Sequence, residues 1–283
     1  MQNKPVQDIQ VGGRIETALS GDYSLSPAKV IAESWRLTMK NFFAFTPSIL
    51  ILLLIIAAIF YIALTLQLGD LSALIPIIQS GDAEQLMPVM QAFIVANISY
   101  EVICAPIYAG ICLMGMSHAV GIKTKPSQIL RGLQFTLPII IMTVIAMTIQ
   151  GIAGIVLSLL SLYVAVALSQ ANLLICEKRM SPIQSMLMSF RAVNKKLFPI
   201  VALYFFMMTL LIASVLFSGI GLILTLPWFF HMKGVLYRDM FGVRLSVQTD
   251  RPLPDDVKVM QSSERSTDNK PTQTSSDDDT FDA

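Results

Sequence analysis

Charged residues are scarce in this chain, and their scarcity excludes an ordinary soluble protein. Of the 283 residues only 14% are charged, whereas 54% are hydrophobic. A soluble domain has about a quarter of its residues charged, because its surface faces water. The segment from Ser48 to Leu66 contains no charged residue, and about twenty apolar residues are enough to span a bilayer. The sequence therefore predicts an integral membrane protein.

Cysteine and histidine are also rare, with three cysteines and two histidines. Cys104 and Cys112 lie about 12 Å apart along one expected helix, too far to form a disulfide. His118 and His231 stand alone in the sequence and match no HExxH pattern, so we expect no metal and no cofactor. The sequence also contains no GxSxG motif, GxGD pair or P-loop. We expect no enzyme, although the absence of known motifs leaves a new intramembrane chemistry open.

Several apolar segments are each long enough to cross a membrane. We place six of them at about 46–67, 90–115, 134–151, 154–175, 197–217 and 219–237. The charge-free stretch from Gln134 to Cys176 is too long for one crossing, and we expect it to turn back at residues 150–154, where Gly151 and Gly154 allow a tight turn. Lipid offers the backbone no hydrogen-bond partners, so each segment should be helical. The predicted fold is all-α.

The positive charges predict the orientation of these helices. All twenty Lys and Arg residues fall in the N-terminal segment, near 117–133, near 176–196, or from Lys233 onward. The connection between the first two helices carries Asp70, Asp82 and Glu84 instead. Because lysine and arginine are retained on the cytoplasmic side, both termini should lie in the cytoplasm.

The ends of the chain differ in composition from its middle. We expect a flexible cytoplasmic N-terminus over 1–25, a transmembrane domain over 26–245 and a disordered cytoplasmic tail over 246–283, which has too few apolar residues to fold. The acidic end of the tail at Asp277–Asp279 could bind a basic protein partner. The net charge of +1 argues against a nucleic-acid partner.

Two segments far apart in the sequence, 26–43 and 181–198, match each other. The identical pairs are Ser26/Ser181, Pro27/Pro182, Ser34/Ser189, Arg36/Arg191, Lys40/Lys195 and Phe43/Phe198. Ser-Pro is a helix start, and each segment has a basic stripe opposite an apolar one. A shorter version begins at Lys125-Pro126, so we expect hairpin repeats, each an interfacial amphipathic helix followed by a transmembrane hairpin. The expected partner is the lipid bilayer, with anionic phospholipids contacted by Trp35, Arg36, Lys40, Lys178, Arg179, Arg191, Lys195 and Lys196.

Glu101 is the charged side chain that we expect inside a membrane segment. Asn97 and Tyr108 lie on the same helical face and complete a candidate intramembrane polar site. An ionisable group in the bilayer is costly and suggests function. The alternative is a carboxyl group that is hydrogen-bonded inside the bundle or hydrated near the outer surface.

Short motifs resemble a known group of membrane proteins. They are the entry pattern Trp35-Arg36-x-x-x-Lys40-Asn41-Phe42, the Ser-Pro-Ile-Gln-Ser of residues 181–185, and the ending Tyr237-Arg238-Asp239-Met240-Phe241-Gly242. Over about residues 26–245 the chain resembles bacterial six-helix inner-membrane proteins, akin to the membrane domain of glycerophosphodiester phosphodiesterases and to related uncharacterised families. The resemblance implies a multi-pass protein of the bacterial inner membrane. It carries over no catalytic residue, because the activity of that family resides in a separate soluble domain.

These observations lead to three functional hypotheses. The first is a non-enzymatic membrane protein that organises or responds to the lipid bilayer, or supports envelope homeostasis. The second is a small-solute or lipid transporter that uses Glu101, which repeated hairpins would suit. The third is a membrane anchor subunit of a larger complex, with the tail as a tether.

Overall fold

The structure is a computed structural model that describes residues 6–217 and 219–248. The chain divides into a helical unit, residues 10–243, and a second unit built from both chain ends. Strands β1 (Val6–Val11) and β2 (Val243–Gln248) pair in a two-stranded sheet. The disordered tail is predicted from residue 246, but residues up to Gln248 belong to β2; from residue 249 onward the predicted tail lies outside the described residues.

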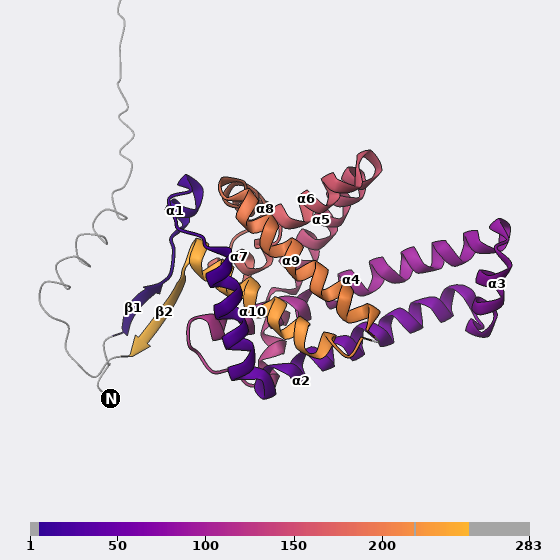
Figure 1. Ribbon diagram of the computed structural model, residues 1–283, viewed down its shortest axis with the longest axis horizontal. Coiled ribbons are helices and arrows are strands. Elements are labelled where there is room, and N and C mark those ends of the chain that lie inside the picture. The colour runs from indigo at the N-terminus through magenta and orange to yellow at the C-terminus, as the bar shows by residue number, and fades with distance from the viewer. Residues whose placement is uncertain (1–5, 218, 249–283) are drawn as a thin grey trace, which may run out of the picture. The chain divides into compact units, whose positions relative to one another are not determined.

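Helices make up nearly all of the remaining regular structure (Figure 1). In chain order they are α1 (Ile15–Ser20), α2 (Pro27–Leu68), η1 (Leu71–Ala73), α3 (Leu74–Ser80), α4 (Ala83–Ala119), η2 (Pro126–Phe135), α5 (Thr136–Val156), α6 (Ser158–Ala167), α7 (Ala171–Lys178), α8 (Pro182–Lys195), α9 (Leu197–Leu216) and α10 (Leu222–Phe241). The predicted all-α class agrees with this architecture.

Five helical stretches are long and apolar enough to span a membrane. They are Pro27–Leu68, Ala83–Ala119, Pro126–Val156, Ser158–Lys178 and Leu197–Leu216. Large apolar side chains stand exposed on them, including Leu137 at 71%, Phe205 at 73% and Ile155 at 88%, as expected for helices that face lipid. The sixth predicted segment, 219–237, does form a helix, α10, but is not among these stretches. Six spans are therefore not confirmed.

Helix α2 joins two segments that the sequence separates. The expected interfacial helix over 26–43 and the first apolar segment belong to one helix of 42 residues. Figure 1 shows that this helix changes direction along its length. Pro47 lies inside the helix, where it removes a backbone donor, and proline is the commonest cause of a sharp kink. The direction changes without an interruption of the helix.

The predicted turn at residues 150–154 is wrong. Gly151 and Gly154 are helical, and α5 continues to Val156. The chain turns instead at Leu157, which is extended with φ −161° and ψ 125°, and α5 and α6 then pack against each other. Glycine allows a turn but does not require one, and α5 gains its full membrane-spanning length by remaining helical through both glycines. At the boundary between the predicted segments 197–217 and 219–237, Gly219 has φ +74°, a conformation that favours glycine.

Helix α10 is the central helix of the helical unit. It packs against α1, α2, α4 and α9, and most of its residues from Phe230 to Phe241 are buried. A close crossing with α4 holds it in place. A Cβ atom on Gly115 would lie 2.6 Å from the Phe230 carbonyl oxygen, and one on Gly234 would lie 2.6 Å from the Gly115 carbonyl carbon. Only glycine allows this approach without a shift of the backbone.

The N-terminal segment is more structured than the flexible terminus that the sequence predicts. Helix α1 packs against α8 and α10, and its Ala18 is fully buried. Gly21, at φ +83°, ends the helix by donating its N–H to the Thr17 carbonyl. The packing of α1 against α10 holds the start of the helical unit against that helix.

Candidate functional site

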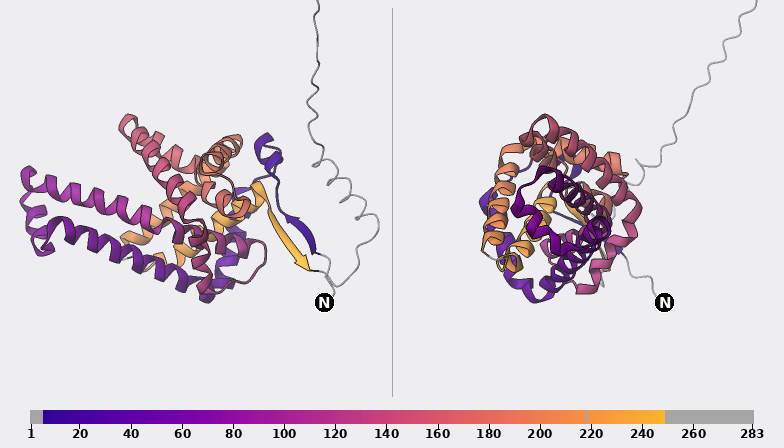
Figure 2. Two further views of the ribbon diagram at one scale, coloured as in Figure 1. Left: turned by 180° about the vertical axis from the view of Figure 1, so that it is seen from behind. Right: turned by 90° about the vertical axis from the view of Figure 1, so that its right-hand side faces the viewer.

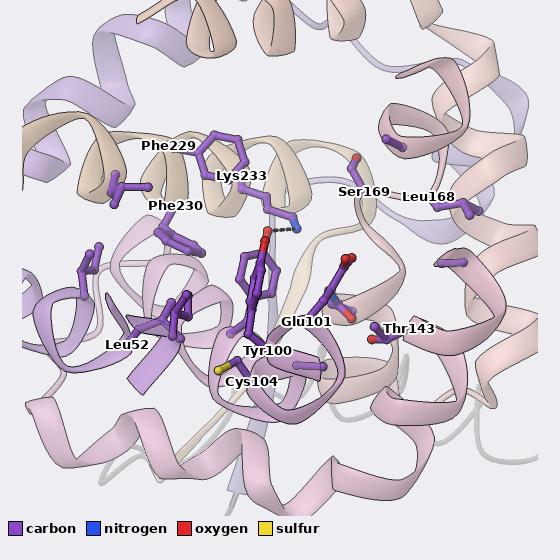
Figure 3. Close-up of a pocket in the computed structure, with 18 of the residues that line it drawn as sticks. Leu52, Tyr100, Glu101, Cys104, Thr143, Leu168, Ser169, Phe229, Phe230 and Lys233 are labelled. Atoms are coloured by element: carbon purple, nitrogen blue, oxygen red, sulfur yellow. Dashed lines mark hydrogen bonds between the residues drawn. The ribbon is translucent and has the colours of Figure 1, made fainter. Parts of the chain in front are cut away.

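A cavity of about 460 Å³ lies among the helices of residues 10–243. Its walls come from α2, α4, α5, α6, α7, α9 and α10, together with the residues between α6 and α7. Leu52, Phe229 and Phe230 belong to its largely apolar wall. Figure 3 shows Glu101, Ser169 and Lys233 directed into the same space from different elements. The volume is typical of small-molecule sites, which combine an apolar wall with a few polar groups.

The structure places two of the three predicted polar-site residues at this cavity. Glu101 and Tyr108, both on α4, line it. Asn97 does not line it and instead donates a hydrogen bond to the Tyr100 hydroxyl over 3.5 Å. The predicted helical face therefore exists, but the cavity covers only the C-terminal part of it.

Lys233 is the most important cavity residue that the predicted polar site omits. It was grouped with the cytoplasmic cations, but its side chain is only 3% exposed and lines the cavity. Its ammonium donates to the Tyr108 hydroxyl over 3.0 Å and lies 4.8 Å from the centre of that ring. A signal was available, because residue 233 lies inside the predicted apolar segment 219–237, where an ionisable group suggests function.

The wall of the cavity contains a break between two helices. Helix α6 ends at Ala167 and α7 begins at Ala171, although the sequence predicts one helix over 154–175. Ser189 of α8 stabilises the break by donating to the Ala167 carbonyl over 2.7 Å and accepting from the Gln170 backbone N–H over 3.2 Å. Ser169 and Asn172, on either side of Gln170, both line the cavity. Broken helices that expose polar groups are typical of substrate sites in membrane transporters.

The two histidines form a buried pair, which corrects the expectation that they stand alone. His118 Nδ1 lies 2.8 Å from His231 Nε2. His231 Nδ1 lies 2.8 Å from the Pro227 carbonyl, which can only accept, so Nδ1 carries the proton. His231 Nε2 therefore accepts from His118 Nδ1–H. His118 Nε2, 2.8 Å from the Thr124 hydroxyl, in turn accepts from it. The histidines are 113 positions apart in the sequence, so no spacing signal could predict this pair.

A compact group of ionic contacts lies at the C-terminal end of α10. The Arg238 guanidinium contacts both carboxylate oxygens of Glu33, at 2.6 and 3.0 Å, and also binds Asp239 and the Ala119 carbonyl. The hydrogen bonds to Glu33 raise the pKa of Arg238 above its ordinary value. Burial raises the pKa of the Asp239 carboxyl, and Arg238 partly opposes this shift. Because Arg238 joins α2, α4 and α10, we assign it a structural role.

Most of the predicted lipid-contacting cations lie on the surface, but not all of them. Among them, Arg36, Lys40, Arg179, Arg191 and Lys195 are exposed. Two others are partly covered. Lys178 pairs with Glu177 at 3.0 Å and donates to the Gly242 carbonyl, and Lys196 lies 5.9 Å above the Tyr23 ring. Lys178 and Lys196 therefore hold the fold together in addition to any contact with lipid.

The two matching segments have matching surfaces. Phe43 is 90% exposed and its counterpart Phe198 is 87% exposed, while Trp35 at 37% corresponds to Phe190 at 40%. The matching serines Ser34 and Ser189 are both fully buried. Ser34 accepts a hydrogen bond from Trp228. Ser189 similarly binds another element, because it donates to the backbone at the break between α6 and α7. Each segment thus presents exposed aromatic rings beside cations, and uses its serine to bind the rest of the bundle.

Comparisons with protein-family models, with curated proteins and with solved structures gave no match. The resemblance to the six-helix inner-membrane proteins therefore stays a prediction.

Proposed function

We propose that this protein binds a membrane lipid in the cavity between its helices, and thereby senses the lipid composition of the bilayer or moves the lipid within it. The proposal joins the first two hypotheses from the sequence and includes no chemical step. The observation that carries it is the buried ammonium of Lys233 in a cavity that also holds Glu101.

The cost of burying charge supports this proposal. An ammonium in an apolar environment is unfavourable unless it is paired. Among residues 6–217 and 219–248, no carboxylate forms an ion pair with Lys233, and a neutral phenol is its hydrogen-bond partner. The fold alone gives no reason for this charge, because a buried ammonium without a counter-ion is destabilising. A bound headgroup explains why the charge is present.

The proposed setting is the bacterial inner membrane, with six spans and both termini in the cytoplasm. The arrangement of the helical unit supports it. In Figures 1 and 2 the hairpin of α2 and α4, with α3 at its tip, extends away from the end where α1 and α7 lie. Asp70 and Asp82 belong to the hairpin tip, whereas the segment around Lys178 belongs to the opposite end. This separation of charge is the pattern expected when lysine and arginine are retained on the cytoplasmic side.

A cavity-filling variant tests lipid binding directly. The full chain is reconstituted in vesicles of phosphatidylethanolamine and phosphatidylglycerol, extracted gently, and weighed by native mass spectrometry. In Ala165→Phe an aromatic ring replaces the methyl group of a half-buried residue in the cavity wall. We expect this variant to retain at least one lipid fewer per chain than the wild type. Ala58→Phe, at an exposed position of α2, is the matched control and should retain the wild-type number.

The same experiment separates a second candidate, in which the exposed aromatic rings and cations of α2 and α8 organise lipid at the membrane surface. Unchanged retention in Ala165→Phe, together with loss in the double variant Arg36→Gln, Lys40→Gln, would replace the first proposal by the second. The anchor-subunit hypothesis depends on the tail, which lies outside the described residues, and it stays a prediction.

A further inference from the structure

Two opposite charges face the cavity without neutralising each other. Glu101 enters from α4 and Lys233 from α10, and Figure 3 shows both side chains directed into the open space. Neither forms an ion pair with the other or with any residue in the described part of the chain. In surroundings of low dielectric constant, two such charges attract strongly. Because no ion pair joins them in the described part of the chain, both charges are available to a ligand that carries the two complementary charges.

Two further polar groups belong to the wall. The Asn172 side-chain carbonyl oxygen is shielded from solvent and accepts no hydrogen bond from the described residues, whereas the Ser169 hydroxyl lies beside the Tyr204 hydroxyl, to which it can donate. Both residues line the cavity beside the break between α6 and α7. Buried polar groups are nearly always hydrogen-bonded, because an unpaired one is costly. The hydroxyl can donate to an anionic oxygen, and the amide oxygen can accept from an ammonium group.

Much of the remaining wall is apolar, although Tyr100, Thr143 and Gln150 also line the cavity. Ile49, Leu53 and Ile56 of α2 line it together with Leu211 of α9 and Leu226 of α10. A small hydrophilic zwitterion would leave this surface without contacts. The first methylene groups of acyl chains would cover it with van der Waals contacts. The cavity therefore suits a molecule with a charged headgroup and an apolar body.

We propose that the cavity holds the headgroup of a zwitterionic phospholipid, with its phosphate at Lys233 and its ammonium at Glu101. Ser169 donates a second hydrogen bond to the phosphate, and Asn172 accepts one from the ammonium. The inference rests on the proposed lipid binding and specifies its ligand. An anionic lipid would satisfy Lys233 but leave Glu101 uncompensated, whereas a cationic amphiphile would satisfy Glu101 and oppose Lys233.

The test measures affinities for lipids that differ only in the headgroup. Phosphatidylethanolamine and phosphatidylglycerol with the same acyl chains are titrated into the detergent-solubilised full chain, and native mass spectrometry gives both dissociation constants. The wild type should prefer phosphatidylethanolamine by at least about tenfold, because a charge-assisted hydrogen bond to the ammonium is worth more than one to a hydroxyl. Glu101→Gln should abolish this preference, while Lys233→Met should weaken both lipids by about tenfold or more, since both carry the phosphate.

Matched controls exclude a general effect of charge. Glu84→Gln removes an exposed carboxylate at the N-terminal end of the same helix as Glu101, and Lys123→Met removes an exposed ammonium that is not among the predicted lipid contacts. Both variants should bind as the wild type does. Free phosphoethanolamine should compete with the lipid at least a hundredfold more weakly than an unlabelled lipid does. Equal competition would show that a soluble zwitterion is the ligand and would overturn the assignment to a lipid.

The outcomes separate the two proposals. Equal affinity of the wild type for both lipids, or an equal loss for both in Glu101→Gln, overturns the zwitterion inference but leaves lipid binding intact, provided that Ala165→Phe weakens both. Affinities for both lipids that Ala165→Phe leaves unchanged refute the cavity as the binding site. The thermal unfolding midpoint of each variant is measured in parallel to detect damage to the fold. Glu101→Asp keeps the charge. If Glu101→Gln loses the preference for phosphatidylethanolamine because it loses the charge, Glu101→Asp should restore at least part of that preference.

Discussion

Two cations of α10, five residues apart, are stabilised in different ways. Arg238 is enclosed by Glu33, Asp239 and a backbone carbonyl, so its charge is neutralised within the protein. Lys233 contacts the hydroxyl and the ring of Tyr108 and lies beside the Cys112 thiol, so its charge is only partly compensated. The planar guanidinium can bind several acceptors at once, which suits a structural junction, whereas an ammonium is a compact point charge suited to a phosphate.

The structural role of Arg238 leads to a prediction. Arg238→Lys keeps the charge but cannot bind both oxygens of Glu33 and the Ala119 carbonyl together. We expect the free energy of unfolding to fall by about 1.5–3 kcal/mol, the value of a hydrogen bond to a charged group, as measured by denaturant unfolding in detergent. Arg191→Lys, at an exposed position, is the control and should change stability by less than about 0.5 kcal/mol. Equal stability of the two variants would contradict the assigned role.

At the scale of elements, the crossing of α4 and α10 determines the geometry of the cavity. The contact between Gly115 and Gly234 brings the two backbones together, and this proximity places Tyr108 of α4 within hydrogen-bond distance of Lys233 of α10. Small residues allow close approach in the same way at many helix crossings in membranes. A change at the crossing should therefore affect both the stability of the bundle and the position of Lys233.

Substitution of Gly115 tests this dependence. In Gly115→Ala the new methyl group would lie 2.6 Å from the Phe230 carbonyl oxygen, so the helices must separate, at a cost of about 1–3 kcal/mol. Gly151→Ala in α5 is the matched control, because nothing lies within 4 Å of its added methyl group. That variant should be more stable than the wild type by about 0.5–1 kcal/mol, since alanine favours a helix. Thermal unfolding that ranks the two variants in the opposite order would refute the close crossing.

The elements also show which features the sequence could predict. Long apolar segments predicted the helices well, because the length of a bilayer-spanning helix is fixed by the membrane. The position of the turn at Leu157 could not be predicted, since Gly151 and Gly154 permit both a turn and a helix. The break at Ser169 depends on a contact with Ser189, which no local pattern reveals. Half of the candidate site was predicted from Glu101, whereas the other half, at Lys233, was missed although that lysine lies inside the predicted apolar segment 219–237.

For the whole molecule, the charge distribution and the helix count are linked. If all six predicted segments cross the membrane, every cation-rich connection lies on one side and the acidic hairpin tip lies on the other. If α10 fails to cross, the residues before and after it lie on the same side. The number of spans can therefore be determined by comparing accessibility at the two ends of α10.

Cysteine labelling in intact cells tests this arrangement, because the three native cysteines are all buried and give little background. Single cysteines are introduced at the exposed positions Ser80, Ser181 and Ile220, and at Ser246, which follows α10 in the chain. With six spans, a membrane-impermeant thiol reagent should label Ser80→Cys and Ile220→Cys at least about tenfold faster than Ser181→Cys and Ser246→Cys, which should react only after lysis.

If Ile220→Cys and Ser246→Cys instead react alike, α10 does not cross. Lys233 would then lie in a helix that enters the membrane from one side only. Rapid labelling of Ser181→Cys in intact cells would reverse the orientation, and the exposed cations of α8 could no longer face the cytoplasm, where positive charge is retained.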